Sequence, residues 1–485
     1  MTTVVDGFIP VIGLEVHAQL LTRSKIFCGC PTTFGGEPNA HTCPVCLGMP
    51  GTLPVLNRAV VELAVRAGVA LGCTVNPVSV FARKNYFYPD LPKGYQITQY
   101  DRPLCEHGVL AFDGHGGEQT VRIKRIHLEE DAGKSVHDAH ATSSLVDLNR
   151  AGVPLMEIVS EPDLHDAGDA AEYLRTLRDV LVYLGVNDGN LEEGSFRCDA
   201  NVSVMRVGDK AFGTRVELKN INSFRFVQQA IDFEIRRQVD LVSGGGKVVQ
   251  ETRLWDPDRG ETRAMRGKEE AHDYRYFPEP DLPPLRVEVA QVEAARRALP
   301  ELPRARQRRF RERYKLPEGD TKVLVGDRAL ADLYEATLRA SPAPGVEPKR
   351  LANWFLGEVL RLLNESGTSA SQVKFKPVQL AALLGLVDAG TISHSAAKEV
   401  FAAMFSEGAD PQAVVEARGL AQVSDTSAIE AIVDEVLAKN AAEVERYRGG
   451  KKNTFGFFVG QVMKAMKGKG NPQIVNALLK QKLGE

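Results

Sequence analysis

The sequence lacks any apolar run long enough to cross a lipid bilayer. A membrane helix needs roughly 18 consecutive apolar residues, and no window of the 485 residues reaches that length. The first six residues also lack the basic charges that precede the apolar stretch of a secretory signal. These absences predict a cytoplasmic protein.

Cysteine is scarce, and its distribution argues against a disulfide framework. The chain has seven cysteines, an odd number, of which Cys73, Cys105 and Cys198 stand alone. The other four form two close pairs, a spacing that can place four thiolates around zinc in a closed tetrahedron. Free thiols or a redox pair are the alternatives, although the sequence after the second pair reads as a turn rather than the helix that follows a redox pair. We predict a structural zinc site at Cys28, Cys30, Cys43 and Cys46.

The chain has no overall excess of positive charge. It carries 60 Lys and Arg against 63 Asp and Glu, so a nucleic-acid partner must meet a local basic region. Residues 446–484 form such a region, with nine basic residues and no acidic one. A solvated basic face is the alternative, but this imbalance favours contact with nucleic-acid phosphates. The candidate contacts are Lys451, Lys452, Lys464, Lys467 and Lys469.

Several common catalytic fingerprints are absent. Gly133-Lys134-Ser135 resembles the end of a phosphate-binding P-loop, but that motif needs a glycine five positions before Gly133, where Leu128 stands. Neither the GxGxxG fingerprint of dinucleotide-binding proteins nor the GxSxG elbow of hydrolases occurs. The sequence therefore does not support a P-loop, a dinucleotide-binding site or a GxSxG hydrolase.

The patterning predicts an α+β protein with several domains. Alternating strands dominate before residue 285, with helices expected over 169–184 and 223–242. Proline-rich stretches at 278–284 and 342–348, and a small polar run at 366–371, mark breaks, and helical patterns follow the first break. We predict a mixed α/β domain over 1–290 that contains the zinc motif, then all-helical domains over 291–368 and 369–485. Within the last domain, helices are expected to begin at a capping box of Ser427 and Glu430 and at Asn471-Pro472.

Three of the predicted strands carry polar side chains on one face. Glu15, His17 and Gln19 alternate with apolar residues, and so do the polar residues of 197–203 and 215–219. The last two segments are expected to pair as a hairpin. Half-solvated strands with incidental polar residues are the alternative.

Acidic residues occur where burial is expected. Glu129, Glu130 and Asp131 end one strand, and Glu157 lies in an apolar strand, where an unpaired carboxylate is costly. Carboxylates that converge from several strands can bind Mg²⁺, and interleaved cations would suit the phosphates of ATP. The alternative is an internal network of ion pairs.

The segment 83–96 combines cations, aromatic residues and prolines in a loop too polar for a core. It contains Lys84 and Lys93. Such a loop can bind phosphate or stack a base, or it can be a rigid surface loop with its aromatic rings tucked underneath.

Several of these segments together resemble one family. They are 13–17, 83–96, 127–135, 193–201, 217–223, 458–464 and 470–473. In this order they are similar to the B subunit of bacterial glutamyl/aspartyl-tRNA amidotransferase, and the resemblance covers essentially the whole chain. A nearer alternative is the archaeal relative that acts only on Glu-tRNA(Gln), but the resemblance implies an inserted domain and a longer chain for that family, so the length of 485 residues argues against it.

The resemblance implies a cradle-shaped N-terminal domain with a kinase-like site, followed by helical domains that hold tRNA. ATP would phosphorylate the side-chain carboxylate of Glu on tRNA(Gln) or Asp on tRNA(Asn), and ammonia would then displace the phosphate. By motif, Glu15, His17 and Glu130 would bind Mg²⁺, and Glu157 would act just outside the ligands. The cations expected to handle phosphate are Lys84, Lys93, Arg197 and Lys219.

The chain lacks a recognisable glutaminase. Its only glycine tract, 243–246, has no serine pair, and no Cys/His arrangement stands out. The resemblance implies that an amidase A subunit supplies ammonia and that a small C subunit completes a heterotrimer. The competing hypothesis is a non-catalytic scaffold that binds tRNA.

Overall fold

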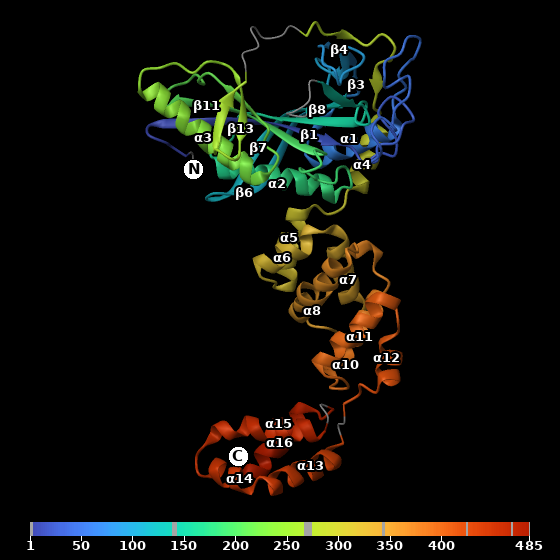
Figure 1. Cartoon of the computed structure of the whole chain (residues 1–485), viewed down its shortest axis with the longest axis vertical. Helices are drawn as coiled ribbons and strands as arrows, with labels where there is room; N and C mark the ends of the chain where they lie inside the picture. The colour runs from blue at the N-terminus through green and yellow to red at the C-terminus, as the bar shows by residue number, and fades with distance from the viewer. Residues whose placement is uncertain are drawn as a thin grey trace. The chain divides into compact units, whose positions relative to one another are not determined.

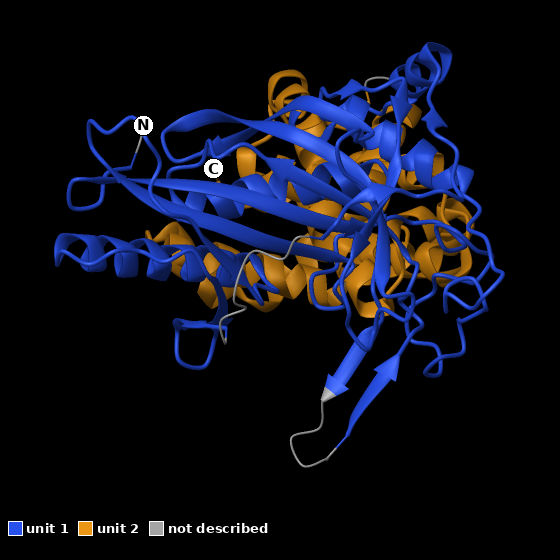
Figure 2. Ribbon diagram, turned by 90° about the horizontal axis from the view of Figure 1, so that it is seen from above, with its two compact units in different colours: residues 1–304 blue, residues 305–485 orange. Residues whose placement is uncertain are grey.

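The computed structural model describes residues 3–137, 143–265, 274–341, 345–422, 425–466 and 469–484. The chain divides into two compact units, Met1–Arg304 and Ala305–Glu485 (Figure 2). The first is built on a large mixed sheet and the second is helical (Figure 1), so the predicted fold class is confirmed. The domain limits at 290/291 and 368/369 stay a prediction. No helix among the described residues has the length and apolar character needed to span a membrane.

The first unit contains a twelve-stranded sheet. Its main path runs β14-β13-β12-β11-β1-β10-β7-β5-β4-β15, and β6 pairs with both β7 and β2. Among the described strands, β12 and β13 pair in parallel and the other pairings are antiparallel. The strands are β1 (Phe8–Gln19), β2 (Thr74–Val75), β4 (Phe81–Asn85), β5 (Tyr95–Gln99), β6 (Cys105–Gly114), β7 (Gly117–Glu130), β10 (Pro154–Ser160), β11 (Phe196–Arg206), β12 (Val216–Lys219), β13 (Thr252–Asp256), β14 (Glu261–Ala264) and β15 (Phe277–Pro278).

Two short ribbons accompany the large sheet. One pairs β3 (Val78–Ser79) with β16 (Leu285–Arg286), and the other pairs β8 (Lys134–His137) with β9 (Ser144–Asp147). The predicted hairpin is confirmed, because β11 and β12 pair with Ala200 opposite Leu218.

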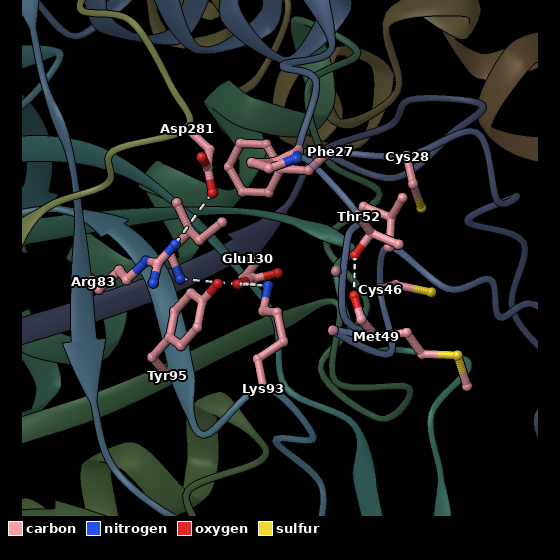
Figure 3. Close-up of a pocket in the computed structure, with 15 residues that line it drawn as sticks. Phe27, Cys28, Cys46, Met49, Thr52, Arg83, Lys93, Tyr95, Glu130 and Asp281 are labelled. Atoms are coloured by element: carbon pink, nitrogen blue, oxygen red, sulfur yellow. Dashed lines mark hydrogen bonds and ion pairs between the residues drawn. The ribbon is translucent and has the colours of Figure 1, made fainter.

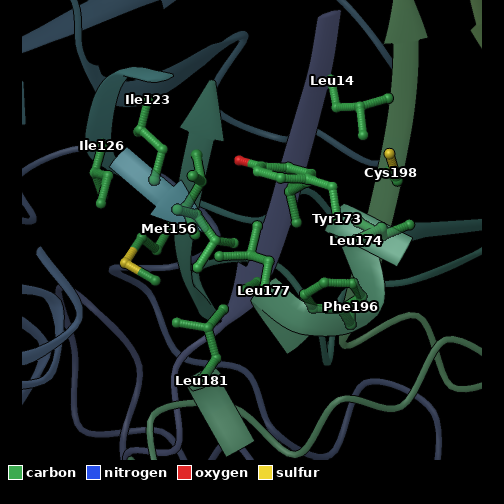
Figure 4. Close-up of a cluster of buried hydrophobic side chains, with 14 of the residues drawn as sticks. Leu14, Ile123, Ile126, Met156, Tyr173, Leu174, Leu177, Leu181, Phe196 and Cys198 are labelled. Atoms are coloured by element: carbon green, nitrogen blue, oxygen red, sulfur yellow. The ribbon is translucent and has the colours of Figure 1, made fainter. Parts of the chain in front are cut away.

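Helices pack on the apolar face of the sheet. The helix α2 (Ala167–Tyr183) buries Leu174, Leu177 and Leu181 on one side, at the i, i+3, i+7 spacing of an amphipathic helix. Figure 4 shows these leucines in one cluster with Leu14 of β1 and Met156 of β10. The other helices of this unit are α1 (Arg58–Ala70), α3 (Phe224–Ser243) and α4 (Val289–Ala298). Because the side chains on one face of β1 pack in this core, the alternating side chains on its other face are available for a functional site.

The elements described in the second unit are helices joined by loops, and the first of them, α5, begins two residues before the limit of the unit. It contains α5 (Pro303–Tyr314), α6 (Glu318–Gly326), α7 (Arg328–Ala340), α8 (Pro348–Trp354), a π-helical segment (Phe355–Val359), α9 (Leu360–Ser366), α10 (Pro377–Asp388), α11 (His394–Glu407), α12 (Pro411–Arg418), α13 (Thr426–Lys439), α14 (Ala441–Arg448), α15 (Phe455–Ala465) and α16 (Pro472–Leu483). The last four helices share their own buried apolar cluster.

Helix caps explain where these elements begin. The Asn471 side chain accepts a hydrogen bond from the N–H of Gln473 and Pro472 is the first helical residue, as predicted. The cap predicted at Ser427 is wrong, because Asp425 caps α13 by accepting from the N–H of Ser427. An aspartate before the helix offers the same acceptor two residues earlier.

Candidate active site on the polar face of the sheet

The pairing register brings polar side chains from distant segments to one face of the sheet. His17 of β1 lies opposite Glu157 of β10 and opposite Arg197 of β11. Glu157 in turn lies opposite His127 of β7. Residues directly opposite one another in an antiparallel pair point to the same face, so these side chains share the face that α2 and α3 do not cover.

Three of the side chains on this face can hold one metal ion. His17, Glu129 and Glu157 each offer one ligand atom, and these atoms lie within 4.8 Å of one another. The Nε2 atom of His17 is 3.4 Å from Oε2 of Glu157 and 3.8 Å from Oε1 of Glu129. Carboxylate oxygens suit Mg²⁺, and three protein ligands leave coordination positions open for phosphate oxygens and water. We call these three residues the acid–histidine triad.

A second histidine, His127, contacts both carboxylates of the triad. Its Nε2 atom is 3.3 Å from Oε2 of Glu157 and 3.7 Å from Oε2 of Glu129, and its side chain is buried. Burial would lower the pKa of His127, but the charge of Glu157 and the hydrogen bond with Glu129 outweigh burial and raise it to about 9. Burial likewise opposes ionisation of both carboxyls, yet the histidines hold their pKa values below the ordinary range. Both carboxylates therefore stay ionised and ready to bind a cation.

Glu130 does not join this group, although it was predicted to bind the metal together with His17. Successive residues of a strand point to opposite faces, so Glu129 rather than Glu130 lies beside His17. The Glu130 carboxylate pairs with Lys93 and accepts a 2.9 Å hydrogen bond from the N–H of Ile97. Figure 3 shows the Glu130–Lys93 pair in a pocket that Tyr95, Arg83 and Cys46 also line.

Glu15 lies beside the triad on the same face. It is opposite Asp199 on β11, and its Oε1 atom accepts a 3.0 Å hydrogen bond from the side-chain amide of Asn201. Burial, followed by the charge of Glu157, raises the pKa of Glu15. Its oxygens are outside the set of atoms that lie within 4.8 Å of one another. The structure therefore places Glu15 next to the three ligand atoms rather than among them.

Two of the predicted phosphate-binding cations are already paired with acids. The guanidinium of Arg197 donates a 3.0 Å hydrogen bond to Asp131. The ammonium of Lys219 lies 2.6 Å from Asp199 and 2.9 Å from Glu217. The predicted alternative of an internal ion-pair network thus holds for this part of the face, and these acids fix the positions of the two cations.

Lys84 is different, because it forms no ion pair with any described residue. Its Nζ atom lies 4.9 Å from the ring centroid of Tyr274 and 5.8 Å from that of Tyr86. Burial opposes its charge, but the negative charge of Glu129 outweighs burial and raises the pKa of Lys84. The structure thus holds a charged ammonium near the triad without a carboxylate partner among the described residues.

The four predicted zinc ligands come together in the loop before α1. The sulfur atoms of Cys28, Cys30, Cys43 and Cys46 lie within 4.8 Å of one another. The Sγ atoms of Cys43 and Cys46 are 3.9 Å apart, close to the edge of a tetrahedron with Zn–S bonds of about 2.3 Å. Hydrogen bonding from the Cys28 thiol lowers the pKa of Cys46, which favours the thiolate that metals bind. The cluster can hold a metal such as zinc.

The basic tail contributes exposed cations to the second unit. Lys451 and Lys452 precede α15, Lys464 lies in its last turn and Lys469 follows it. All four are exposed. Lys467, the fifth predicted contact, lies outside the described residues.

Glu129 and His127 are members of the site that the sequence did not identify. The signal was present, because the alternation along β7 puts residues 127 and 129 on one face and 130 on the other. Which face meets His17 depends on the register between β7, β10 and β1, and the sequence does not show that register.

Comparison with known proteins gives concordant matches. The family described as GatB/GatE catalytic domain matches residues 10–293, and the family described as GatB domain matches residues 332–483. The chain is 66% identical over 481 residues to the B subunit of the aspartyl/glutamyl-tRNA(Asn/Gln) amidotransferase of Myxococcus xanthus, covering 99% of this chain and 100% of that protein. The protein of the same name from Geobacter sulfurreducens is 59% identical over 476 residues, covering 98% of each chain.

Proposed function

Because the chain belongs to the family of aspartyl/glutamyl-tRNA(Asn/Gln) amidotransferase B subunits, we propose that it activates the side-chain carboxylate of Glu-tRNA(Gln) or Asp-tRNA(Asn) with ATP. Ammonia cannot displace oxide from a carboxylate, so the oxygen must first become part of a better leaving group. Transfer of the γ-phosphoryl group supplies that leaving group. Attack by ammonia then forms the amide, releases phosphate and yields Gln-tRNA(Gln) or Asn-tRNA(Asn).

The observation that carries this proposal is the acid–histidine triad on the polar face of the sheet. His17, Glu129 and Glu157 would hold Mg²⁺, with Glu15 beside them and His127 fixing the two carboxylates. The metal would offset the charge of ATP phosphates during phosphoryl transfer. Holding the ligand carboxylates ionised and rigid is the contribution of the protein, because positioning and electrostatics dominate this class of reaction.

The neighbouring cations would complete the site. Lys84, which has no ion pair with a described residue, suits a phosphate or carboxylate oxygen of the substrate. Arg197 and Lys219 are held by acids on the other side of His17, where they would meet phosphates of ATP. On the opposite face, Lys93 and Glu130 would remain a structural pair.

We further propose that this subunit works in the cytoplasm with an amidase A subunit and a small C subunit. The relatives are named as one subunit of an amidotransferase, and this chain shows no glutaminase motif, so ammonia would come from a partner. The lysines of the basic tail would contact the phosphates of tRNA. Zinc at the four cysteines would stabilise the loop before α1 without taking part in chemistry.

The test is amide formation on Glu-tRNA(Gln) by the assembled complex, supplied with ATP, Mg²⁺ and free ammonia. Free ammonia bypasses the partner's glutaminase. We expect Glu157→Gln to lower kcat by at least about 100-fold, because the ligand loses its charge with little change of shape. The matched control is Glu62→Gln on α1, where the exposed carboxylate pairs with Arg58 at 2.7 Å and full activity is expected.

The same assay separates the enzyme from a non-catalytic scaffold. If Glu157→Gln and Glu129→Gln make amide as fast as the wild type while tRNA binding is intact, the triad has no catalytic role. The chain would then be the scaffold that holds tRNA for another subunit.

A further inference from the structure

The polar face of the sheet continues from the triad to a group of tyrosines. Thr98 of β5 lies opposite Glu129 of β7 and also opposite Ala82 of β4. Lys84 follows Ala82 by two residues on the same face of β4, and Tyr100 follows the last residue of β5. The register of β15 against β4 pairs Phe277 with Arg83, which places residue 276 beside Lys84.

The rings form an ordered cluster. Tyr100 and Tyr276 are stacked, with centroids 3.9 Å apart and an interplanar angle of 4°. Tyr274 packs edge-on against Tyr276 at 6.0 Å and against Tyr86 at 6.1 Å. Tyr100 is nevertheless 46% exposed, and Phe87 is 87% exposed. A stacked pair at the surface is a preformed platform on which a further planar ring can stack.

We infer that Tyr100 and Tyr276 stack the 3′-terminal adenine of the aminoacyl-tRNA. This inference rests on the proposed function and names the part of the substrate that this end of the site receives. The acceptor end of tRNA is single-stranded, and proteins hold unpaired bases by stacking them on aromatic side chains. The aminoacyl group sits on the ribose of that same nucleotide, so a fixed base aims the reactive carboxylate.

The distance across the sheet from the triad to the stacked tyrosines fits such a substrate. From β7, which carries Glu129, to β15 beside Tyr276 there are three strand spacings of about 4.8 Å each. That is the scale of one adenosine with an extended glutamyl ester. Lys84 lies between the platform and the triad, where it can meet the carboxylate of the ester.

The other flank of the triad suits ATP better. Arg197 and Lys219 lie on β11 and β12, on the far side of β1 from the tyrosines. Arg197 and Lys219, which neighbouring acids hold in place, would face the triphosphate there, whereas the tyrosine flank offers rings and the ammonium of Lys84. We therefore assign the stacked rings to tRNA and the β11–β12 flank to ATP.

The experiment compares Tyr276→Leu and Tyr100→Leu with the ring-preserving controls Tyr276→Phe and Tyr100→Phe, all in the assembled complex. One arm measures KM for Glu-tRNA(Gln) and, separately, KM for ATP, with free ammonia. A second arm binds tRNA that carries 2-aminopurine in place of its terminal adenine and records fluorescence, which stacking on the rings quenches.

We expect each leucine variant to raise KM for aminoacyl-tRNA by about tenfold or more, to leave KM for ATP unchanged and to lose the quenching, while each phenylalanine variant keeps the quenching. A rise in KM for ATP instead would assign the platform to ATP and overturn the inference. If the leucine variants fail to assemble into the complex, the two tyrosines belong to a protein interface, and the inference is overturned. If the kinetics and the quenching both stay unchanged, the two tyrosines have no role in binding tRNA, and the inference is also overturned. If the wild-type complex makes no amide, the proposed function fails. The quenching measurement does not depend on amide formation, so it still shows whether the terminal base stacks on Tyr100 and Tyr276.

Discussion

A buried carboxylate in the second unit makes a quantitative test of how this helical region is held together. Glu335 of α7 is buried and accepts hydrogen bonds of 2.7 Å from Arg306, 2.6 Å from Arg309 and 2.7 Å from the Tyr314 hydroxyl. Burial would raise the pKa of Glu335, but these three donors outweigh burial and lower it from 4.5 to about 2. The ionised carboxylate therefore ties α5 to α7.

The magnitude follows from that pKa. Each unit of pKa corresponds to about 1.4 kcal/mol, and solvent near the paired arginines screens part of the interaction. Ionised Glu335 therefore contributes about 2–3 kcal/mol to the free energy of unfolding at neutral pH. Because the folded pKa is depressed, this contribution is complete above the unfolded value of 4.5 and disappears as pH falls through about 2. We expect Glu335→Gln to lose about 2–3 kcal/mol at pH 7 and less than half of that near pH 3.

The assay uses the two tryptophans of the chain, one in each unit. Substitution of Trp255 by Phe leaves Trp354, which is 4% exposed in α8 and reports unfolding of the second unit. Urea unfolding of the full chain, followed by this fluorescence at several pH values, compares the Trp255→Phe protein with and without Glu335→Gln. The control is Glu365→Gln, whose exposed ion pair with Arg361 is expected to contribute less than about 1 kcal/mol.

Two results would contradict this account. Equal stability of the two proteins at pH 7 would show that the ion-pair network contributes nothing. A loss that stayed constant from pH 7 to pH 3 would show that the effect comes from packing rather than from the charge of Glu335.

Three further predictions concern the first unit. Cys43→Ser is expected to lower zinc content below one per chain and to lower the thermal midpoint, as read by metal analysis and calorimetry; unchanged zinc and stability would exclude the site. Gly48→Ala is expected to destabilise the loop before α1 by about 1 kcal/mol or more, because φ of Gly48 is +67° and an added Cβ would clash with Cγ of Lys93. The measurement is the rate of proteolysis, and a rate no faster than in the wild type would contradict this prediction. Leu177→Ala should cost about 2–5 kcal/mol, since the side chain is fully buried between α2 and the sheet, and a urea midpoint equal to that of the wild type would show that the core closes around the gap.

Much of the local structure was readable from the chain itself. Alternation identified β1 and β11, the leucine spacing identified α2, and Asn471-Pro472 marked the start of α16. These features depend on neighbours within one or two turns, which is why a sequence reveals them. The four cysteines were equally accessible, because two close pairs bring their thiols together with few intervening residues.

The sequence predicted only some of the residues that the structure brings together in the candidate site. Two residues of the predicted site, His17 and Glu157, lie 3.4 Å apart, and Glu15 lies beside them. The sequence favoured Glu130, whereas the structure places Glu129 beside His17 and Glu130 beside Lys93, because a shift of one residue reverses the face to which a strand side chain points. Likewise, the cap of α13 fell two residues from its predicted place, since two suitable acceptors compete there.

Local patterns along the chain were enough to define the elements, the spacing of the zinc ligands and the polar alternation that marks a functional face. They could not say which polar residues meet, because β1, β7, β10 and β11 are far apart along the chain and their register is set by pairing across the sheet. That register turned Glu129 toward His17 and Glu130 toward Lys93. It also aligned Lys84 and the stacked tyrosines with the triad, a continuity that arises only when the strands have paired.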